Sequence, residues 1–303
     1  MIKNVATIFM SIFFESLPFL LLGSLISAII ETFVSNEKMA KLIPKNKFLG
    51  SIVGVFLGFF LPACDCAVIP VSKRLLKKKV PINVAVSFML ASPIINPVVM
   101  LSTYYAFYKT DPKIFWFRLI FGIVVALVIG TIMGIIFGKE EVTTNNSDKE
   151  CACEHCEHDH HHEKENKLVS IVKHTALDLF DVVKFLMFGA LIASLVQVLI
   201  PRSIITTFNN NNILSIIVLM IFAYLISLCS TSDSFVGKSL LSSFTESSIV
   251  AYLLLGPMID VKNTMVLLGN YKKKFVVTLI SLIFMVIFII SALVVNILWK
   301  RNF

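Results

Sequence analysis

Apolar runs long enough to cross a lipid bilayer recur along this sequence, and they limit its fold more than any other feature. Residues 5–34 and 114–138 are two such runs, and each reaches the length of about 20 residues that a helix needs to span the hydrocarbon core. Of the 303 residues, 57% are hydrophobic and only 15% are charged. The sequence therefore predicts an all-α, multi-pass protein of the cell membrane, in contact with membrane lipid.

A polar segment divides the chain near its middle. Residues 139–167 read KEEVTTNNSDKECACEHCEHDHHHEKENK and show no apolar periodicity, so we expect a flexible loop. The segment separates a first membrane domain, residues 1–138, from a second one, residues 168–303.

The two membrane domains match each other in three places that follow in the same order. ESLPFLLLGSLISA matches DVVKFLMFGALIAS, and SPIINP matches GPMIDV. Such internal repeats are typical of transporters, although chance similarity between apolar segments is the alternative. The matched pairs are Glu15 with Asp181, Gly23 with Gly189, Cys64 with Cys229, and Asn96 with Asp260.

The distribution of basic residues indicates how the two domains are oriented. Segments 35–47 and 73–79 of the first domain are rich in Lys and Arg, whereas their counterparts in the second hold only Arg202 and Lys238. Because cytoplasmic loops carry the excess of Lys and Arg, equivalent loops are expected on opposite sides, which predicts an inverted repeat.

Each repeat is predicted to contain three spanning helices and one re-entrant or broken hairpin, which gives 6 to 10 membrane segments for the chain. The 14 apolar residues at 48–61 would form a helix of about 21 Å, too short to span. The predicted spans are 5–34, 81–107, 114–138, 168–200, 248–270 and 275–299, and the predicted hairpins are 48–76 and 213–244.

Two prolines, Pro62 and Pro70, bracket the stretch ACDCAVI in the first hairpin. Proline cannot continue a helical hydrogen-bond ladder, so we expect a turn here, near the tip of the hairpin. Irregular backbone at membrane depth occurs only where protein or a water-filled cavity satisfies it. The stretch therefore predicts the lining of a cavity.

This turn carries soft ligands. Cys64 and Cys66 flank Asp65, and Cys229 occupies the matching place in the second half. Thiolates prefer soft or borderline ions, and a charge at the bilayer centre requires a partner, a proton or a substrate. These four residues are predicted to bind a thiophilic solute or a metal ion. The alternative is that the cysteines pack as small hydrophobic side chains.

The stretch SPIINP predicts a break in a spanning helix. Pro93 and Pro97 interrupt the apolar run, and Asn96 and the matching Asp260 supply polar side chains. Broken helices at matching positions point to a transporter's binding site. Asn96 and Asp260 are therefore predicted to line the solute site, with plain structural kinks as the alternative.

Glu15 and Asp181 are matched acids in the first helix of each half. Acids inside spanning helices often carry protons in a transport cycle, so proton coupling is one interpretation. Acids near the membrane interface are the other.

The central loop contains the stretch CACEHCEHDHHH, which is dense in thiol and imidazole groups. Such a tract binds Zn²⁺ or copper ions, although its spacing is not that of a zinc finger. Metal capture or sensing is one interpretation, and a solvated linker that binds metal incidentally is the other. The candidate ligands are Cys151, Cys153, His155, Cys156, His158, His160, His161 and His162.

The stretch LPACDCAVIPVSKRLLKKKVPINVAVSFMLASPIINPVV resembles the central motif of the UPF0718-type predicted permeases, a family that includes the ArsP organoarsenical efflux permeases. The resemblance covers nearly the whole chain. It implies an inner-membrane permease in which Cys64 and Cys66 take the places of the family's cysteines. It also implies a trivalent arsenical, or a soft metal ion such as copper or zinc, as the solute.

Taken together, the sequence predicts an efflux permease for a thiophilic solute, working by alternating access with proton coupling. No enzymatic activity, cofactor or nucleic acid is expected. VGKS at 236–239 is not a nucleotide site, because Ser232 stands where a phosphate-binding loop needs glycine. The alternatives are a transmembrane thiol–disulfide carrier, which would need disulfide exchange, and a membrane subunit that acts only with a second permease subunit.

Overall fold

The structure of the protein is a computed structural model that describes residues 2–33, 44, 46–60, 65–138, 142–143, 167–199 and 212–295. Over these residues the secondary structure is helical, apart from one isolated bridge between Thr143 and Tyr271. The predicted all-α fold class is confirmed.

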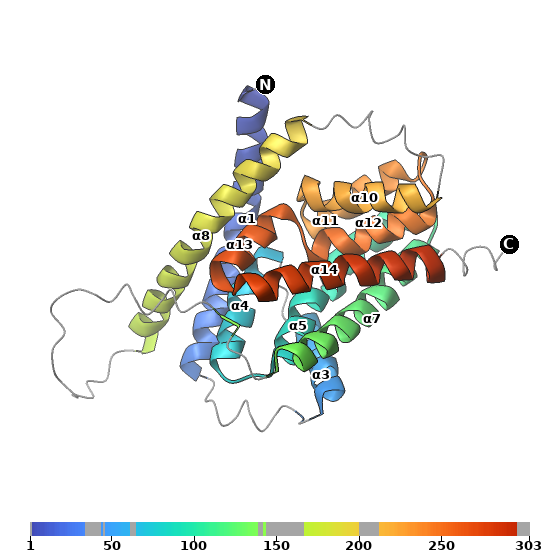
Figure 1. Ribbon diagram of the computed structural model, residues 1–303. Coiled ribbons are helices and arrows are strands. Elements are labelled where there is room, and N and C mark those ends of the chain that lie inside the picture. Colours follow the sequence, from blue (N-terminus) through green and yellow to red (C-terminus); the bar gives the residue numbers. More distant parts are fainter. Residues whose placement is uncertain are drawn as a thin grey trace, which may run out of the picture.

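The two halves contain helices in the same order and of similar lengths (Figure 1). The described part of the first half forms α1 (Ile2–Phe33), α3 (Lys47–Phe60), α4 (Asp65–Lys77), α5 (Ile82–Ile95), α6 (Pro97–Phe107) and α7 (Lys113–Ile136). The second half follows with α8 (Lys167–Leu199), α10 (Asn212–Ile226), α11 (Ser230–Leu240), α12 (Glu246–Met258), α13 (Val261–Asn270) and α14 (Lys273–Ile289), which continues as a π-helix, η2 (Ile290–Val295).

Six candidate spans emerge from the described helices, as predicted. Five segments are long and apolar enough to cross a membrane by themselves, and α5 with α6 forms a sixth that is bent by 41°. Helices α3 and α10, the first arms of the predicted hairpins, are apolar but shorter than a span. The protein is thus a multi-pass membrane protein that contains both spanning helices and shorter apolar helices.

The turn predicted between Pro62 and Pro70 is wrong in its extent. Helix α4 begins at Asp65 and runs through Pro70. Pro70 is the sixth residue of the helix, so it costs the helix a hydrogen bond without ending it. Pro93 likewise lies inside α5, and only Pro97, as the first residue of α6, coincides with the break. The first helix position suits proline because its N–H would have no partner there.

Glycines allow α3, α5 and α7 to pack closely. A Cβ atom at Gly58 of α3 would lie 3.0 Å from the backbone nitrogen of Ser92 in α5. On the other side of α5, a Cβ atom at Gly134 of α7 would lie 2.6 Å from the Cβ atom of Asn83. Small residues at such contacts bring helix backbones together, which is how helices gain packing energy in lipid.

A basic segment of each half, residues 73–79 in the first and 272–274 in the second, lies near the same part of the chain. Lys73 Nζ near the end of α4 donates to Asn270 Oδ1 at 3.0 Å, and the Lys272 N–H donates to the carbonyl oxygen of Val142 at 2.9 Å. Val142 of the polar segment therefore lies beside Lys272. Assignment of this side to the cytoplasm stays a prediction.

Helices α1 and α8 lie side by side along one flank of the molecule (Figure 1). They contact the rest of the chain differently, however. Gly23 of α1 packs against Ala67 of α4, whereas the matched Gly189 of α8 packs against Lys262 of α13. The order of helices supports a repeat, but an inverted symmetry between the halves is not confirmed.

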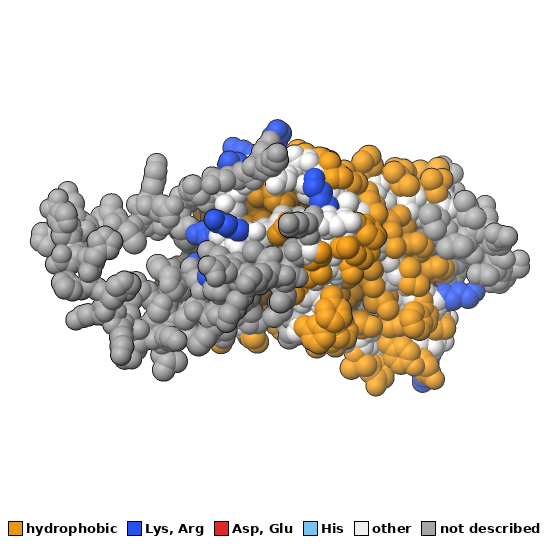
Figure 2. Space-filling view, turned by 90° about the horizontal axis from the view of Figure 1, so that it is seen from below, with side chains coloured by type: hydrophobic (Ala, Val, Ile, Leu, Met, Phe, Trp, Pro, Cys, Tyr) orange, Lys and Arg blue, Asp and Glu red, His pale blue; other side chains and the backbone are white. Residues whose placement is uncertain are grey.

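Hydrophobic side chains cover a broad area of the surface, and Lys and Arg side chains lie toward its edges (Figure 2). Exposed examples are Phe56 of α3, Trp116 of α7 and Phe188 of α8. In water such an area would be a binding or aggregation surface. In a membrane protein it is the surface that lipid tails cover.

Candidate functional site

The two broken spans resume at matched residues. Asn96 separates α5 from α6, and its Oδ1 accepts a hydrogen bond from the Val98 N–H at 3.0 Å. Ile259 and Asp260 separate α12 from α13, and Asp260 Oδ1 accepts from the Asn263 N–H at 2.6 Å. Each side chain caps the helix that follows, which satisfies an N–H group that the break leaves without a helical partner. Both residues are buried.

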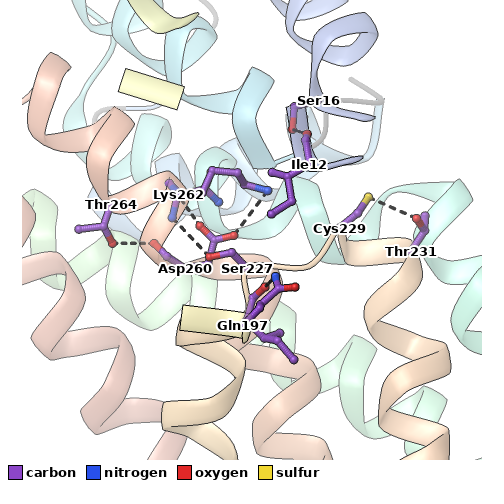
Figure 3. A network of polar contacts seen from close by, with 11 residues as sticks. Ile12, Ser16, Gln197, Ser227, Cys229, Thr231, Asp260, Lys262 and Thr264 are labelled. Atoms are coloured by element: carbon purple, nitrogen blue, oxygen red, sulfur yellow. Dashed lines mark hydrogen bonds and ion pairs between the residues drawn. The ribbon is translucent and has the colours of Figure 1, made fainter. Parts of the chain in front are cut away.

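A third break, between α10 and α11, lies against the Asp260 break. Ser227 has a left-handed backbone conformation, with φ of 47°, which is uncommon for a residue other than glycine. Its Oγ accepts a hydrogen bond from the Lys262 N–H at 3.4 Å, and Gln197 of α8 donates to the carbonyl oxygen of Ile226. Figure 3 shows these contacts around the chain that joins α10 to α11.

Cys229 is the last residue of that break and stands directly before α11. It is half-buried, and its Sγ lies 3.3 Å from Thr231 Oγ1 (Figure 3). Its sequence counterpart Cys64 directly precedes α4. In the sequence, the two matched cysteines therefore directly precede the first residues of α4 and α11.

Asp260 also forms a buried ion pair. Its Oδ2 lies 3.6 Å from Lys262 Nζ, and the two side chains are 0% and 5% exposed. Figure 3 shows the pair beside Ser227. Removing one partner from a buried pair leaves an uncompensated charge at high cost. Asp260 and Lys262 are thus a single neutral unit at the α12–α13 break.

A buried arginine connects the two halves. Arg118 of α7 donates to Thr103 Oγ1 of α6 at 2.7 Å and to Ser234 Oγ of α11 at 2.6 Å. It also donates to the Ser230 carbonyl oxygen at 3.3 Å. Thr103 and Ser234 are themselves 3.0 Å apart. The first half thereby holds the N-terminal turn of α11, beside Cys229.

Asp233 lies on the same turn of α11. It is buried, and it is near enough to Arg118 and to Asp260 to interact with both charges, with the Tyr252 hydroxyl beside it. A Cβ atom at Gly256 would lie 2.6 Å from its Oδ2. Two acids and two bases are therefore enclosed between α7, α11 and the α12–α13 break.

The structure brings some of the predicted site residues together. Cys229 and Asp260 belong to adjoining breaks, and Asn96 holds the equivalent position in the first half. Glu15 lies on α1 with its side chain exposed. The side chains of Asp65, Cys66 and Asp181 lie outside the described part, as do Cys64 and the loop residues Cys151, Cys153, His155, Cys156, His158, His160, His161 and His162.

Sequence reasoning missed three charged residues of this region: Arg118, Asp233 and Lys262. Each stands within or beside an apolar run, in WFRLIF, STSDSF and IDVKNT. A charge in such a place is costly in a membrane and marks a functional position by default. The sequence alone could have pointed to two of these residues. Asp233 follows Cys229 by four positions, and Lys262 follows the matched stretch GPMIDV directly.

Chemically, the region combines a half-buried thiol, enclosed charges and three helix breaks. Within the described residues no three His, Cys, Asp or Glu side chains come together as a metal site. The single thiol that the structure places, Cys229, would hold a soft solute only with other ligands. Broken helices around enclosed charges are the usual surroundings of a transporter site.

A family model described as a predicted permease, of the ArsP type, matches residues 1–297. The chain belongs to this family. The family that the sequence resembles is thereby confirmed.

Two relatives cover nearly the whole permease chain. One, from Streptococcus mutans, is 37% identical over 292 residues, covers 96% of this chain and 94% of its own length, and is named as a subunit of a two-component membrane permease complex. The other, from Bacillus subtilis, is named UPF0718 protein YcgR and is 38% identical over 292 residues, with 95% and 96% covered. A UPF0718 protein from Methanocaldococcus jannaschii matches 40% of this chain and 33% of its own length at 28% identity. No solved structure matches.

Proposed function

We propose that this permease moves its solute past the two broken spans, with the Asn96 and Asp260 breaks on its path. The observation that carries the proposal is that both breaks resume at matched, buried, side-chain-capped residues. A helix break is tolerated at membrane depth where it lines a cavity or is held by protein. The enclosed charge pair at one break adds a feature that a merely structural kink does not need.

We further propose that the solute is thiophilic, a trivalent arsenical or a soft metal ion, and that the permease exports it. Cys229 supports this because it is half-buried at the α10–α11 break, where it directly precedes α11. Cys64 and Cys66 stand at the matching place in the sequence. A solute that moves between the two repeats would then exchange one thiol ligand for another. Glu15 and Asp181 are the candidates for proton coupling that the sequence alone offers.

The test is uptake into everted membrane vesicles, in which export appears as accumulation. Trivalent methylarsenical, arsenite, Zn²⁺ and Cu⁺ would each be offered to a protein without residues 145–163, so that chelation by the loop does not imitate transport. Saturable uptake that is lost in both Cys229→Ser and Cys229→Ala supports the proposal. Uptake kept in Cys229→Ser but lost in Cys229→Ala assigns the role to a small polar group and rejects the thiol. Uptake unchanged when Cys64, Cys66 and Cys229 are all serine also rejects it.

A second candidate function is that the chain is one subunit of a two-subunit permease. The name of the Streptococcus mutans relative, which is similar along 96% of this chain, favours it. The purified chain would be reconstituted alone in liposomes and tested with the solute that everted vesicles accumulate. Transport by the chain alone contradicts the two-subunit function, whereas transport restored only by a co-purified membrane protein supports it.

A further inference from the structure

We propose that Asp233 is the proton-carrying group of this permease, binding a proton on Oδ2 in one stage of the cycle and releasing it in another. The proposal rests on the proposed transport function and names the residue that couples it to protons. It concerns a side chain that no sequence motif assigned.

The surroundings of the carboxyl group support a titrating role. Asp233 is 2% exposed, and its buried Oδ2 makes no short hydrogen bond of good geometry, with the Tyr252 hydroxyl as the donor beside the carboxyl group. Burying an ionised carboxylate that has few donors around it is unfavourable. Binding a proton removes that charge from the oxygen, so the carboxyl group has a stable neutral form in this place.

The groups that face Asp233 come from three elements. Arg118 of α7 favours the ionised form, and Asp260 at the α12–α13 break favours the protonated form. The Tyr252 hydroxyl of α12 is the hydrogen-bond donor beside the carboxyl group and also favours the ionised form. Because charges of both signs act on one carboxyl group, a small shift of either element changes which form is more stable.

A proton fits this place better than a metal cation does. A Cβ atom at Gly256 would lie 2.6 Å from Oδ2, so α12 leaves little room for a metal ion and its other ligands on that side. A metal cation such as Na⁺ needs several oxygen ligands around it, whereas a proton needs only the one oxygen. The chemistry is a simple association of the carboxylate and a proton from water, with no change in oxidation state.

The same contacts connect the proton to movement of the halves. With Asp233 ionised, the charge of Arg118 in the first half is balanced by a residue of the second half. With Asp233 protonated, Arg118 keeps its bonds to Thr103, Ser234 and the Ser230 carbonyl but loses that balancing charge. Asp233 Oδ2 also faces Gly256 of α12, four residues before Asp260. Opening of the α12–α13 break would therefore expose the proton site. Protonation would thus shift the population between two arrangements of the breaks.

The experiment is infrared difference spectroscopy of the full-length purified protein in lipid, titrated over roughly pH 4 to 9, a range that spans ordinary carboxyl values and neutral pH. The wild type is expected to show a protonated-carboxyl band that disappears as the pH rises. Asp233→Asn should lack it, Asp233→Glu should keep it at a shifted midpoint, and Asp111→Asn, in the exposed turn before α7, should leave it unchanged.

Three results would overturn the proposal: no titrating buried carboxyl band in the wild type, a band that survives Asp233→Asn, or a band that disappears in Glu15→Gln instead. Should Asp233→Asn fail to fold, an unshifted midpoint in Asp233→Glu would also reject it. The measurement needs no solute. A negative infrared result would therefore not contradict the proposed transport pathway. Conversely, failure of solute uptake would not contradict the assignment of the proton to Asp233, which the infrared spectrum alone tests.

Discussion

Asn96 and Asp260 perform the same task in the two halves of the chain: each lies in the break of a broken span and caps the helix that follows with its side-chain oxygen. The sequence match that pairs them is therefore a structural equivalence. They differ in charge, because only Asp260 has a cationic partner, Lys262. Both breaks therefore have the same side-chain cap on the following helix, and the Asp260 break has an ion pair in addition.

The first prediction concerns that pair. Asp260→Asn keeps a capping oxygen but leaves Lys262 without its counter-charge, and Lys262→Met leaves Asp260 charged and alone. Each change should destabilise the fold by about 3–5 kcal/mol, the range for breaking a buried pair. The double variant should recover a large part of the loss, because it removes both charges.

Thermal unfolding in detergent measures this cycle. Asp111→Asn, which removes a carboxyl group from the exposed turn before α7, is the matched control and should change the melting temperature little. A double variant whose loss equals the sum of the single losses would show that Asp260 and Lys262 act independently.

A second prediction follows from the three bonds that Arg118 makes with two other helices. Arg118→Lys keeps the charge but lacks the planar group that reaches two hydroxyls and a carbonyl together. The loss should be about 1.5–3 kcal/mol for each bond to a charged group that is not replaced. Melting temperature and cross-linking between α6 and α11 are the measurements. Lys109→Arg, an exposed exchange in the opposite sense, should have no effect, and an equally silent Arg118→Lys would contradict the role.

The helix breaks could be predicted from the sequence, whereas the contacts between the broken helices could not. SPIINP and GPMIDV contain their own signals, since proline and an Asn or Asp cap act on the adjacent backbone. Arg118 needs Thr103, Ser234 and Ser230 as partners, and only the packing of α6, α7 and α11 brings these together.

Pro70 shows that a proline in the sequence can also mislead a prediction. It was predicted to end a turn and instead lies within α4, where the surrounding helices stabilise what the residue alone disfavours. Tertiary packing therefore decides how much of the chain around a proline stays helical.

The third prediction tests the close packing of α5 and α7. In Gly134→Ala the added methyl group would lie 2.6 Å from the Cβ atom of Asn83, which cannot move without its helix. Overpacking of this kind costs about 1–3 kcal/mol, so the melting temperature should fall. In Gly237→Ala the methyl group would lie 3.0 Å from the end of the Leu253 side chain, which can rotate away. A loss in Gly237→Ala as large as that in Gly134→Ala would contradict the packing argument.

The last prediction separates the cysteines and histidines of the central loop from the membrane site. Residues 145–163 hold three cysteines and five histidines, enough thiol and imidazole groups to bind Zn²⁺ without a folded site. Replacing them with a Gly/Ser segment of equal length should remove most of the zinc that the purified protein retains, as measured by elemental analysis, and should leave the melting temperature unchanged. Cys229→Ser should do the opposite and leave the retained zinc unchanged, because one thiol holds zinc weakly when no other ligand joins it. Zinc that stays bound after the loop is replaced, and is lost only with the membrane cysteines, would move the metal to the helix breaks and make Zn²⁺ itself the first solute to test.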